Sequence, residues 1–168
     1  MTNEEICHRV ALALRMMRDD EADLIEMDAN ERSITHRFAV HLESQFEGWN
    51  VDCEYNRDCS EEDYIKRLPV HQTDEIKPND DEAKTVFPDI IVHKRNQKHN
   101  LLVIEMKKTG RRSPSIDESK LKAFTGLDFA YRLGILLMIP DCFHGPFLGR
   151  KTKLFKNGEV VEANRDNQ

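Results

Sequence analysis

Two apolar, β-rich runs joined by a short polar segment constrain the fold of this chain more than any other feature. The first run is Phe87 to His93, the second is Asn100 to Lys107, and residues 94–99 lie between them. Runs rich in Ile, Val and Leu with a polar link of this length are typical of an antiparallel β-hairpin. The second run stays apolar on both faces until Glu105, so we expect a charged group at the end of a buried strand.

Helix and strand patterns on both sides of the hairpin predict an α/β domain that spans residues 1–168. The acidic stretch 19–28 is expected to be either a short helix or a link. In the helix after the hairpin, the apolar spacing predicts that Ile116 and Leu127 face the core. The expected elements are helices at 2–18, 30–47 and 115–129, strands at 51–55 and 133–139, and a hairpin at 153–162 that turns at Asn157–Gly158.

Length and composition exclude several classes of protein. The 168 residues are enough for one domain with its own core, and no apolar run approaches the roughly 20 residues of a membrane helix. The first residues lack the basic and apolar regions of a signal peptide, so we expect a cytoplasmic protein without a membrane segment. The polar stretch 57–85 is predicted to be an insertion or a lid, and residues 164–168 a loose tail.

The formal net charge of −6 hides an uneven distribution of charged residues. Residues 1–90 carry 10 basic and 23 acidic side chains, whereas residues 91–168 carry 15 basic and 8 acidic ones. The acidic total argues against a protein that coats nucleic acid by bulk attraction, while the basic second half is compatible with a local surface for phosphates. An ordinary solvated surface explains the same counts equally well.

Three charged residues of the predicted hairpin are expected to meet at one end of it. Glu105 and Lys107 lie two residues apart on one strand and therefore share a face. A hairpin that turns about Gln97 places Asp89 opposite Glu105, and a turn about Lys98 places Asp89 opposite Lys107. Two carboxylates this close repel each other unless a cation lies between them, and hard oxygen ligands suit Mg²⁺ or Mn²⁺. The group therefore indicates a metal site for phosphodiester hydrolysis.

The same residues also admit a structural interpretation, in which Asp89 caps a turn after Pro88 and Glu105 forms a surface ion pair with Lys107. The order helix, strand, hairpin with acids, helix, strand nevertheless resembles the PD-(D/E)xK, or restriction-endonuclease-like, nuclease superfamily and its small bacterial members. The signature stands here as Pro88-Asp89, fifteen residues, and then Glu105-Met106-Lys107.

This resemblance covers about residues 30–140. It implies a core of the order α-β-β-β-α-β, in which a mixed central β-sheet is flanked by helices. The N-terminal helix and the C-terminal hairpin that the residue patterns predict are additions to this core. Asp89 and Glu105 are then expected to bind Mg²⁺ or Mn²⁺. The backbone carbonyl of Met106 is implied as a further ligand, and Lys107 as the catalytic lysine. No Q-x-x-x-Y follows the lysine, which argues against the recombination-exonuclease branch of the superfamily.

Many members of the superfamily add an acid from the helix before the first strand, and Glu31 is the better candidate for that role here. The apolar residues of the helix fall within about 60° of Glu31 on a helical wheel, whereas Glu43 lies about 120° from it. Asp28 and Glu31 also fit a capping box, and an acid in a first helical turn is favoured by the helix dipole. A metal-binding role and a capping role can coexist.

Basic residues after the motif are candidates for contact with a nucleic-acid backbone, with a solvated basic surface as the alternative. These residues are Lys108, Arg111, Arg112 and Lys120. We therefore expect a Mg²⁺- or Mn²⁺-dependent nuclease whose partner is nucleic acid, DNA rather than RNA. The alternatives are a catalytically inactive nuclease-fold module that binds nucleic acid or protein, and a structural ion-pair cluster without a substrate. A homodimer, or a protein partner docked on the insertion, also stays open.

Overall fold

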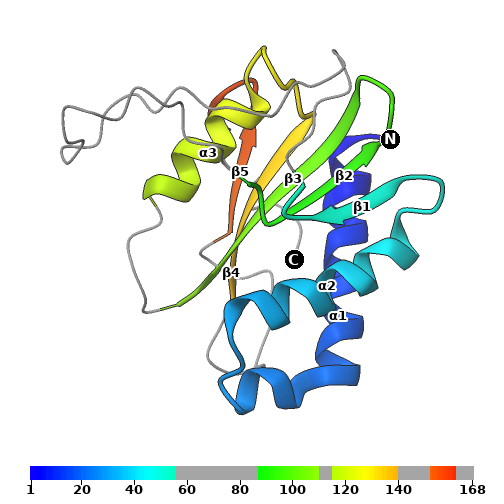
Figure 1. The fold of residues 1–168 in the computed structure, drawn as a ribbon, viewed down its shortest axis with the longest axis vertical. Helices are drawn as coiled ribbons and strands as arrows, with labels where there is room; N and C mark the ends of the chain where they lie inside the picture. The colour runs from blue at the N-terminus through cyan, green and yellow to red at the C-terminus, as the bar shows by residue number, and fades with distance from the viewer. Residues whose placement is uncertain (56–86, 110–114, 140–151, 162–168) are drawn as a thin grey trace.

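The structure is a computed structural model that describes residues 1–55, 87–109, 115–139 and 152–161. The described residues form a mixed α/β fold in which three helices pack on a six-stranded mixed sheet of order β1-β2-β3-β4-β5-β6 (Figure 1). The expected order of elements is confirmed. In chain order they are α1 (Asn3–Glu26), α2 (Glu31–Gln45), β1 (Asn50–Cys53), β2 (Ile90–Lys94), β3 (His99–Lys108), α3 (Ser115–Thr125), β4 (Leu133–Ile139), β5 (Lys153–Lys156) and β6 (Glu159–Val161).

The sheet lies between two helical layers, with α1 and α2 on one face and α3 on the other (Figure 1). Alternation along β3 determines which layer each side chain meets. Leu102, Ile104 and Met106 pack in the core beneath α1 and α2, whereas Val103 packs beneath α3. Continuing that alternation, Glu105 and Lys107 belong to the α3 face of the sheet.

The central hairpin forms as expected, and β3 extends beyond the point at which β2 begins. Ile90 of β2 lies opposite Ile104 of β3 in an antiparallel pair that contains an irregularity between Val92 and His93. On its other side β3 pairs with β4 in parallel through Lys108. The register at this end of the hairpin, continued by one residue, places Asp89 opposite Glu105, which is the first of the two arrangements that the sequence left open.

The first helix is longer than its sequence pattern predicts. It continues through the acidic stretch to Glu26, although the backbone of Glu21 leaves helical geometry at φ −142° and ψ 35°. The carboxylate of Glu21 is held by α2, where Arg37 Nε lies 2.6 Å from Oε2 and His41 Nε2 lies 2.9 Å from Oε1. This contact with a second helix explains why an acidic segment with little apolar periodicity stays helical.

The third helix is shorter than expected, which corrects two predicted core residues. The helix ends at Thr125, because the Tyr131 N–H donates to the carbonyl of Phe124 and turns the chain back towards the sheet. Leu127 is 98% exposed as a result, and Ile116 in the first turn is 61% exposed. The apolar spacing therefore overstated both the length of the helix and the width of its buried face.

A glycine on β4 sets how closely α3 approaches the sheet. A Cβ atom at Gly134 would lie 2.9 Å from Thr125 Cγ2 and 3.1 Å from the Cβ of Phe155. The glycine therefore permits a close approach that any side chain would block, and so it fixes the height of α3 above β3.

The expected insertion at 57–85 and the expected tail at 164–168 lie outside the described residues. Among the helices of the described part, none combines the length and the apolar character needed to cross a membrane.

Candidate active site

Asp89 and Glu105 lie opposite each other at the open end of the central hairpin. Asp89 directly precedes β2, and Glu105 lies on β3, which continues beyond it. The Oδ2 of Asp89 accepts a 2.7 Å hydrogen bond from the N–H of Met106. Burial raises the pKa of the Asp89 carboxyl, and the Met106 N–H offsets this only in part. The Asp89 carboxylate is thus fixed to the backbone of β3 beside Glu105.

Glu105 is the most unusual charged residue of the site. It is 1% exposed, its Oε2 accepts a 3.0 Å hydrogen bond from the Lys120 ammonium, and its Oε1 has no hydrogen-bond partner within the described residues. Burial, and next the neighbouring charge of Asp89, raise the pKa of Glu105 well above its ordinary value. A buried carboxylate oxygen without a donor is costly, so this oxygen is available to a ligand that the protein itself does not supply.

Two lysines lie on the same side of the sheet as the carboxylates, and an aspartate of α3 joins them. Lys107 Nζ lies 3.1 Å from Asp117 Oδ2, and Lys120 Nζ lies 3.8 Å from Asp117 Oδ1. Because α3 packs over β3, its buried face carries Asp117 and Lys120 to the predicted motif. Asp117 was not predicted as a site residue. Its signal in the sequence is its position three residues before Lys120, which places both side chains on one helix face.

Among the described residues, carboxylates and not a strand pair with the edge of β3 beyond the first residue of β2. The N–H of Met106 donates to Asp89, and the N–H of Lys108 donates to Glu31 Oε2 at 3.1 Å. A residue's N–H and C=O face the same neighbour in an antiparallel ladder, so the Met106 carbonyl also faces the side on which Asp89 lies. Glu31 is therefore brought from α2 to the same strand edge as Asp89.

The helical cap near Glu31 differs from the expected one. The N-cap of α2 is Asn30, whose side chain accepts from the Ser33 N–H at 2.8 Å, and Asp28 lies outside the helix at φ 52°. The predicted capping box of Asp28 with Glu31 is therefore wrong. Glu31 is left to bond the backbone of β3, 77 residues away in the sequence.

The predicted nucleic-acid-binding residues do not lie on one common surface in the described part of the chain. Lys108 is 7% exposed, and its ammonium contacts the Asp28 carboxylate at 2.6 Å and the Ala29 carbonyl on the α1 and α2 side of the sheet. The expectation that Lys108 faces a phosphate is thus corrected, because strand alternation turns it away from Lys107. Lys120 points into the carboxylate cluster. Arg111 and Arg112 lie outside the described residues.

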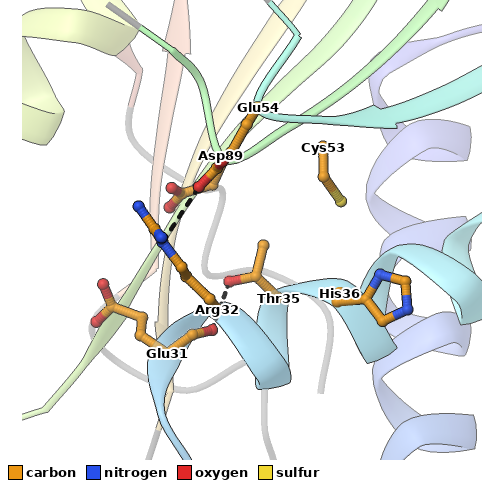
Figure 2. Close-up of a pocket in the computed structure, with 7 residues that line it drawn as sticks. All are labelled: Glu31, Arg32, Thr35, His36, Cys53, Glu54 and Asp89. Carbon is orange, nitrogen blue, oxygen red and sulfur yellow. Dashed lines mark hydrogen bonds and ion pairs between the residues drawn. The ribbon is translucent and has the colours of Figure 1, made fainter.

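A pocket of about 350 Å³ adjoins Asp89 and Glu31 on the side of α2. Figure 2 shows Arg32 of α2 reaching towards Glu54, which directly follows β1, and Arg32 Nε lies 3.3 Å from Glu54 Oε1. Its lining residues are Glu31, Arg32, Thr35, His36, Cys53, Glu54 and Asp89. The space next to Asp89 is therefore open and lined by both acidic and basic groups.

The residues fit a hard divalent cation only in part. No three His, Cys, Asp or Glu side chains in the described parts of the chain stand as a metal-binding group. Mg²⁺, however, is commonly held by one or two carboxylates and completed by water and substrate phosphate. Asp89, Glu105 with its unpartnered Oε1, and the Met106 carbonyl provide hard oxygen donors of that kind.

Comparisons with protein-family models, curated proteins and solved structures found no match to this chain.

Proposed function

We propose that this chain is a Mg²⁺- or Mn²⁺-dependent nuclease that hydrolyses phosphodiester bonds in nucleic acid, DNA in preference to RNA, on a restriction-endonuclease-like core. The observation that carries the proposal is the buried, half-satisfied carboxylate of Glu105 next to Asp89. Retaining such a group without a ligand lowers the stability of the folded chain, so its presence favours a functional role.

In this proposal each residue of the cluster has a distinct task. Asp89 and Glu105, with the Met106 carbonyl, would hold the cation, and Glu31 would support it from α2. When bound, a divalent cation polarises a phosphate oxygen and lowers the pKa of a bound water. Lys107 would donate hydrogen bonds to the attacking water or to the negative charge that develops on the phosphate.

The contact between Lys107 and Asp117 supports this assignment of the lysine. Lys107 is on the same sheet face as Glu105, and its ammonium is held 3.1 Å from a carboxylate that comes from a different element. A fixed ammonium meets a developing charge without first being reorganised, which is the condition for electrostatic catalysis.

A second candidate function is a module of the same fold that binds nucleic acid or protein without cleaving it. It is favoured by the ion pairs of the cluster, since Lys107 and Lys120 both have carboxylate partners and Asp89 and Glu31 both bond the edge of β3. In that case the cluster serves stability alone.

Cleavage assays on DNA and RNA with Mg²⁺ or Mn²⁺ separate the two functions. The native chain should cleave, and Lys107→Ala and Asp89→Asn should each remove the activity. Glu118→Gln is the matched control, because Glu118 neighbours Asp117 on α3 but pairs with Lys153 instead of with the cluster. Binding without cleavage that Lys107→Ala leaves unchanged would support the module instead.

A further inference from the structure

The ammonium of Lys120 occupies the place of a cation beside Glu105. It lies 3.0 Å from Glu105 Oε2 and 3.8 Å from Asp117 Oδ1, so it has two carboxylates within reach. Its side chain is 22% exposed, whereas that of Glu105 is 2% exposed. The lysine therefore enters the cluster from the solvent side, while the carboxylate that it meets is fixed in the interior.

We infer that Lys120 is a displaceable counter-ion, which neutralises Glu105 until a divalent cation binds there and is then transferred to Asp117 and to an incoming phosphate. This inference rests on the proposed metal site and adds to it a link between metal binding and substrate binding. It also gives Lys120 a role that its sequence position alone did not indicate.

The charges of the cluster explain why such an exchange is favourable. Four carboxylates, Asp89, Glu105, Asp117 and Glu31, surround two ammonium groups, so the formal sum is negative and repels a phosphodiester. Uptake of a divalent cation cancels that negative charge. The released Lys120 then joins Lys107 at Asp117, and two ammonium groups on one carboxylate leave positive charge for an anionic substrate.

Another lysine of the chain shows what a fixed counter-ion looks like. Lys108 has a side chain that is 8% exposed and is held by both the Asp28 carboxylate and the Ala29 carbonyl. Removal of its ammonium would leave the Ala29 carbonyl without that donor. Lys120, in contrast, has an alternative acceptor already in range and an open route to solvent, so its departure leaves no such deficit once a metal ion takes its place.

Calorimetric titration of the full chain with Mn²⁺ tests the inference without requiring turnover. Lys120→Met should bind Mn²⁺ about tenfold more tightly than the native chain, because the competing ammonium is gone. Lys122→Met is the matched control: it removes the same charge from an exposed position on α3, and its effect should stay within about twofold because solvent and salt screen it. Lys120→Arg keeps a cation that suits a carboxylate, so its Mn²⁺ affinity should equal or fall below the native value.

The outcomes separate this inference from the proposed function. Unchanged or weaker Mn²⁺ binding by Lys120→Met, or equal tightening by Lys122→Met, would overturn the displaceable role even if the native chain cleaves DNA. Tighter binding by Lys120→Met alone would uphold it even if no nucleic acid is cleaved. Thermal unfolding identifies a variant that fails to fold, in which case Lys120→Gln replaces Lys120→Met in the same titration.

Discussion

The side chains of Glu21 and Glu105 are both largely shielded from solvent, but they differ in the hydrogen-bond donors around their carboxylates. Both oxygens of Glu21 have donors, from the guanidinium of Arg37 and the ring of His41, and these hydrogen bonds, that from Arg37 foremost, lower its pKa. Glu105 has one donor for two oxygens, and burial raises its pKa. The first acid links α1 to α2, whereas we expect the second to lower the free energy of unfolding while no ligand is bound.

The comparison separates a carboxylate that maintains structure from one retained for another reason. The Lys120 ammonium offsets the burial of Glu105 only in part, and the cation of the proposed site would supply the remaining compensation. Substitutions that remove the charge while keeping the shape of each side chain should therefore have opposite consequences at the two positions.

Nuclease activity should show the largest difference between the two acids. Glu105→Gln should lower kcat by at least about 100-fold, because the amide removes a ligand charge from the site. Glu21→Gln should leave kcat within about twofold, since Glu21 lies at the contact of α1 with α2. Cleavage rates on one DNA substrate with Mg²⁺ give both numbers. A comparable loss in both variants would remove the functional distinction.

Stabilisation by metal should be the next largest effect. With Mn²⁺ at 100 times its dissociation constant, the free energy of unfolding of the native chain should rise by about 2.7 kcal/mol, because the ion binds the folded state. Asp89→Asn should abolish this increase and Glu21→Gln should retain it. Urea unfolding with and without Mn²⁺ provides the measurement, and an increase that persists in Asp89→Asn would place the ion elsewhere.

Without divalent ions, the two substitutions should change stability in opposite directions at pH 8. Glu21→Gln should lower the free energy of unfolding by about 1 kcal/mol, because the partly exposed Arg37 loses its charged acceptor. Glu105→Gln should raise it, because a neutral amide is easier to bury than a carboxylate beside Asp89. Urea unfolding of the three proteins in chelator tests this, and a loss of stability in Glu105→Gln would contradict the interpretation of that residue.

The smallest effect should appear in the pH dependence of stability. Because its pKa is raised, Glu105 binds its proton more readily in the folded state than in the unfolded state. Its contribution to the free energy of unfolding therefore falls as the pH rises above the ordinary pKa of 4.5 towards the raised one. The lowered pKa of Glu21 has the opposite sign, and its stabilisation is lost as pH falls below 4.5. In metal-free unfolding experiments, Glu105→Gln should reduce the decrease in the free energy of unfolding above pH 4.5. Glu21→Gln should reduce the decrease below pH 4.5.

The sequence was sufficient for the part of the site that one hairpin builds. Alternation along a strand places Glu105 and Lys107 on one face, and a short polar link limits the register to two possibilities, both of which bring in Asp89. The structure selects the first of them. These are local rules, so they hold without knowledge of the rest of the molecule.

The part that was missed depends on how separate elements pack. Asp117, which was not predicted, and Lys120, which was predicted only as a contact for a nucleic-acid backbone, reach the cluster because α3 lies close above β3, an approach that Gly134 on β4 permits. The side chain of Lys108 was misplaced for a different reason. Alternation already assigns it to the face opposite Lys107, but the run of basic residues suggested a common surface. Glu31 was correctly singled out as a residue near the motif, although its partner is the backbone of β3.

The start of β2 at Ile90, and not earlier in the chain, has one more consequence, which concerns Pro88. Continued one step beyond Asp89, the register places Pro88 opposite Met106, where an ordinary residue would offer its N–H to the Met106 carbonyl. Proline has no such hydrogen to give. Pro88 therefore cannot extend the pairing of β2 with β3, and the Met106 carbonyl oxygen receives no hydrogen bond from residue 88, which would leave it available to the cation of the proposed site.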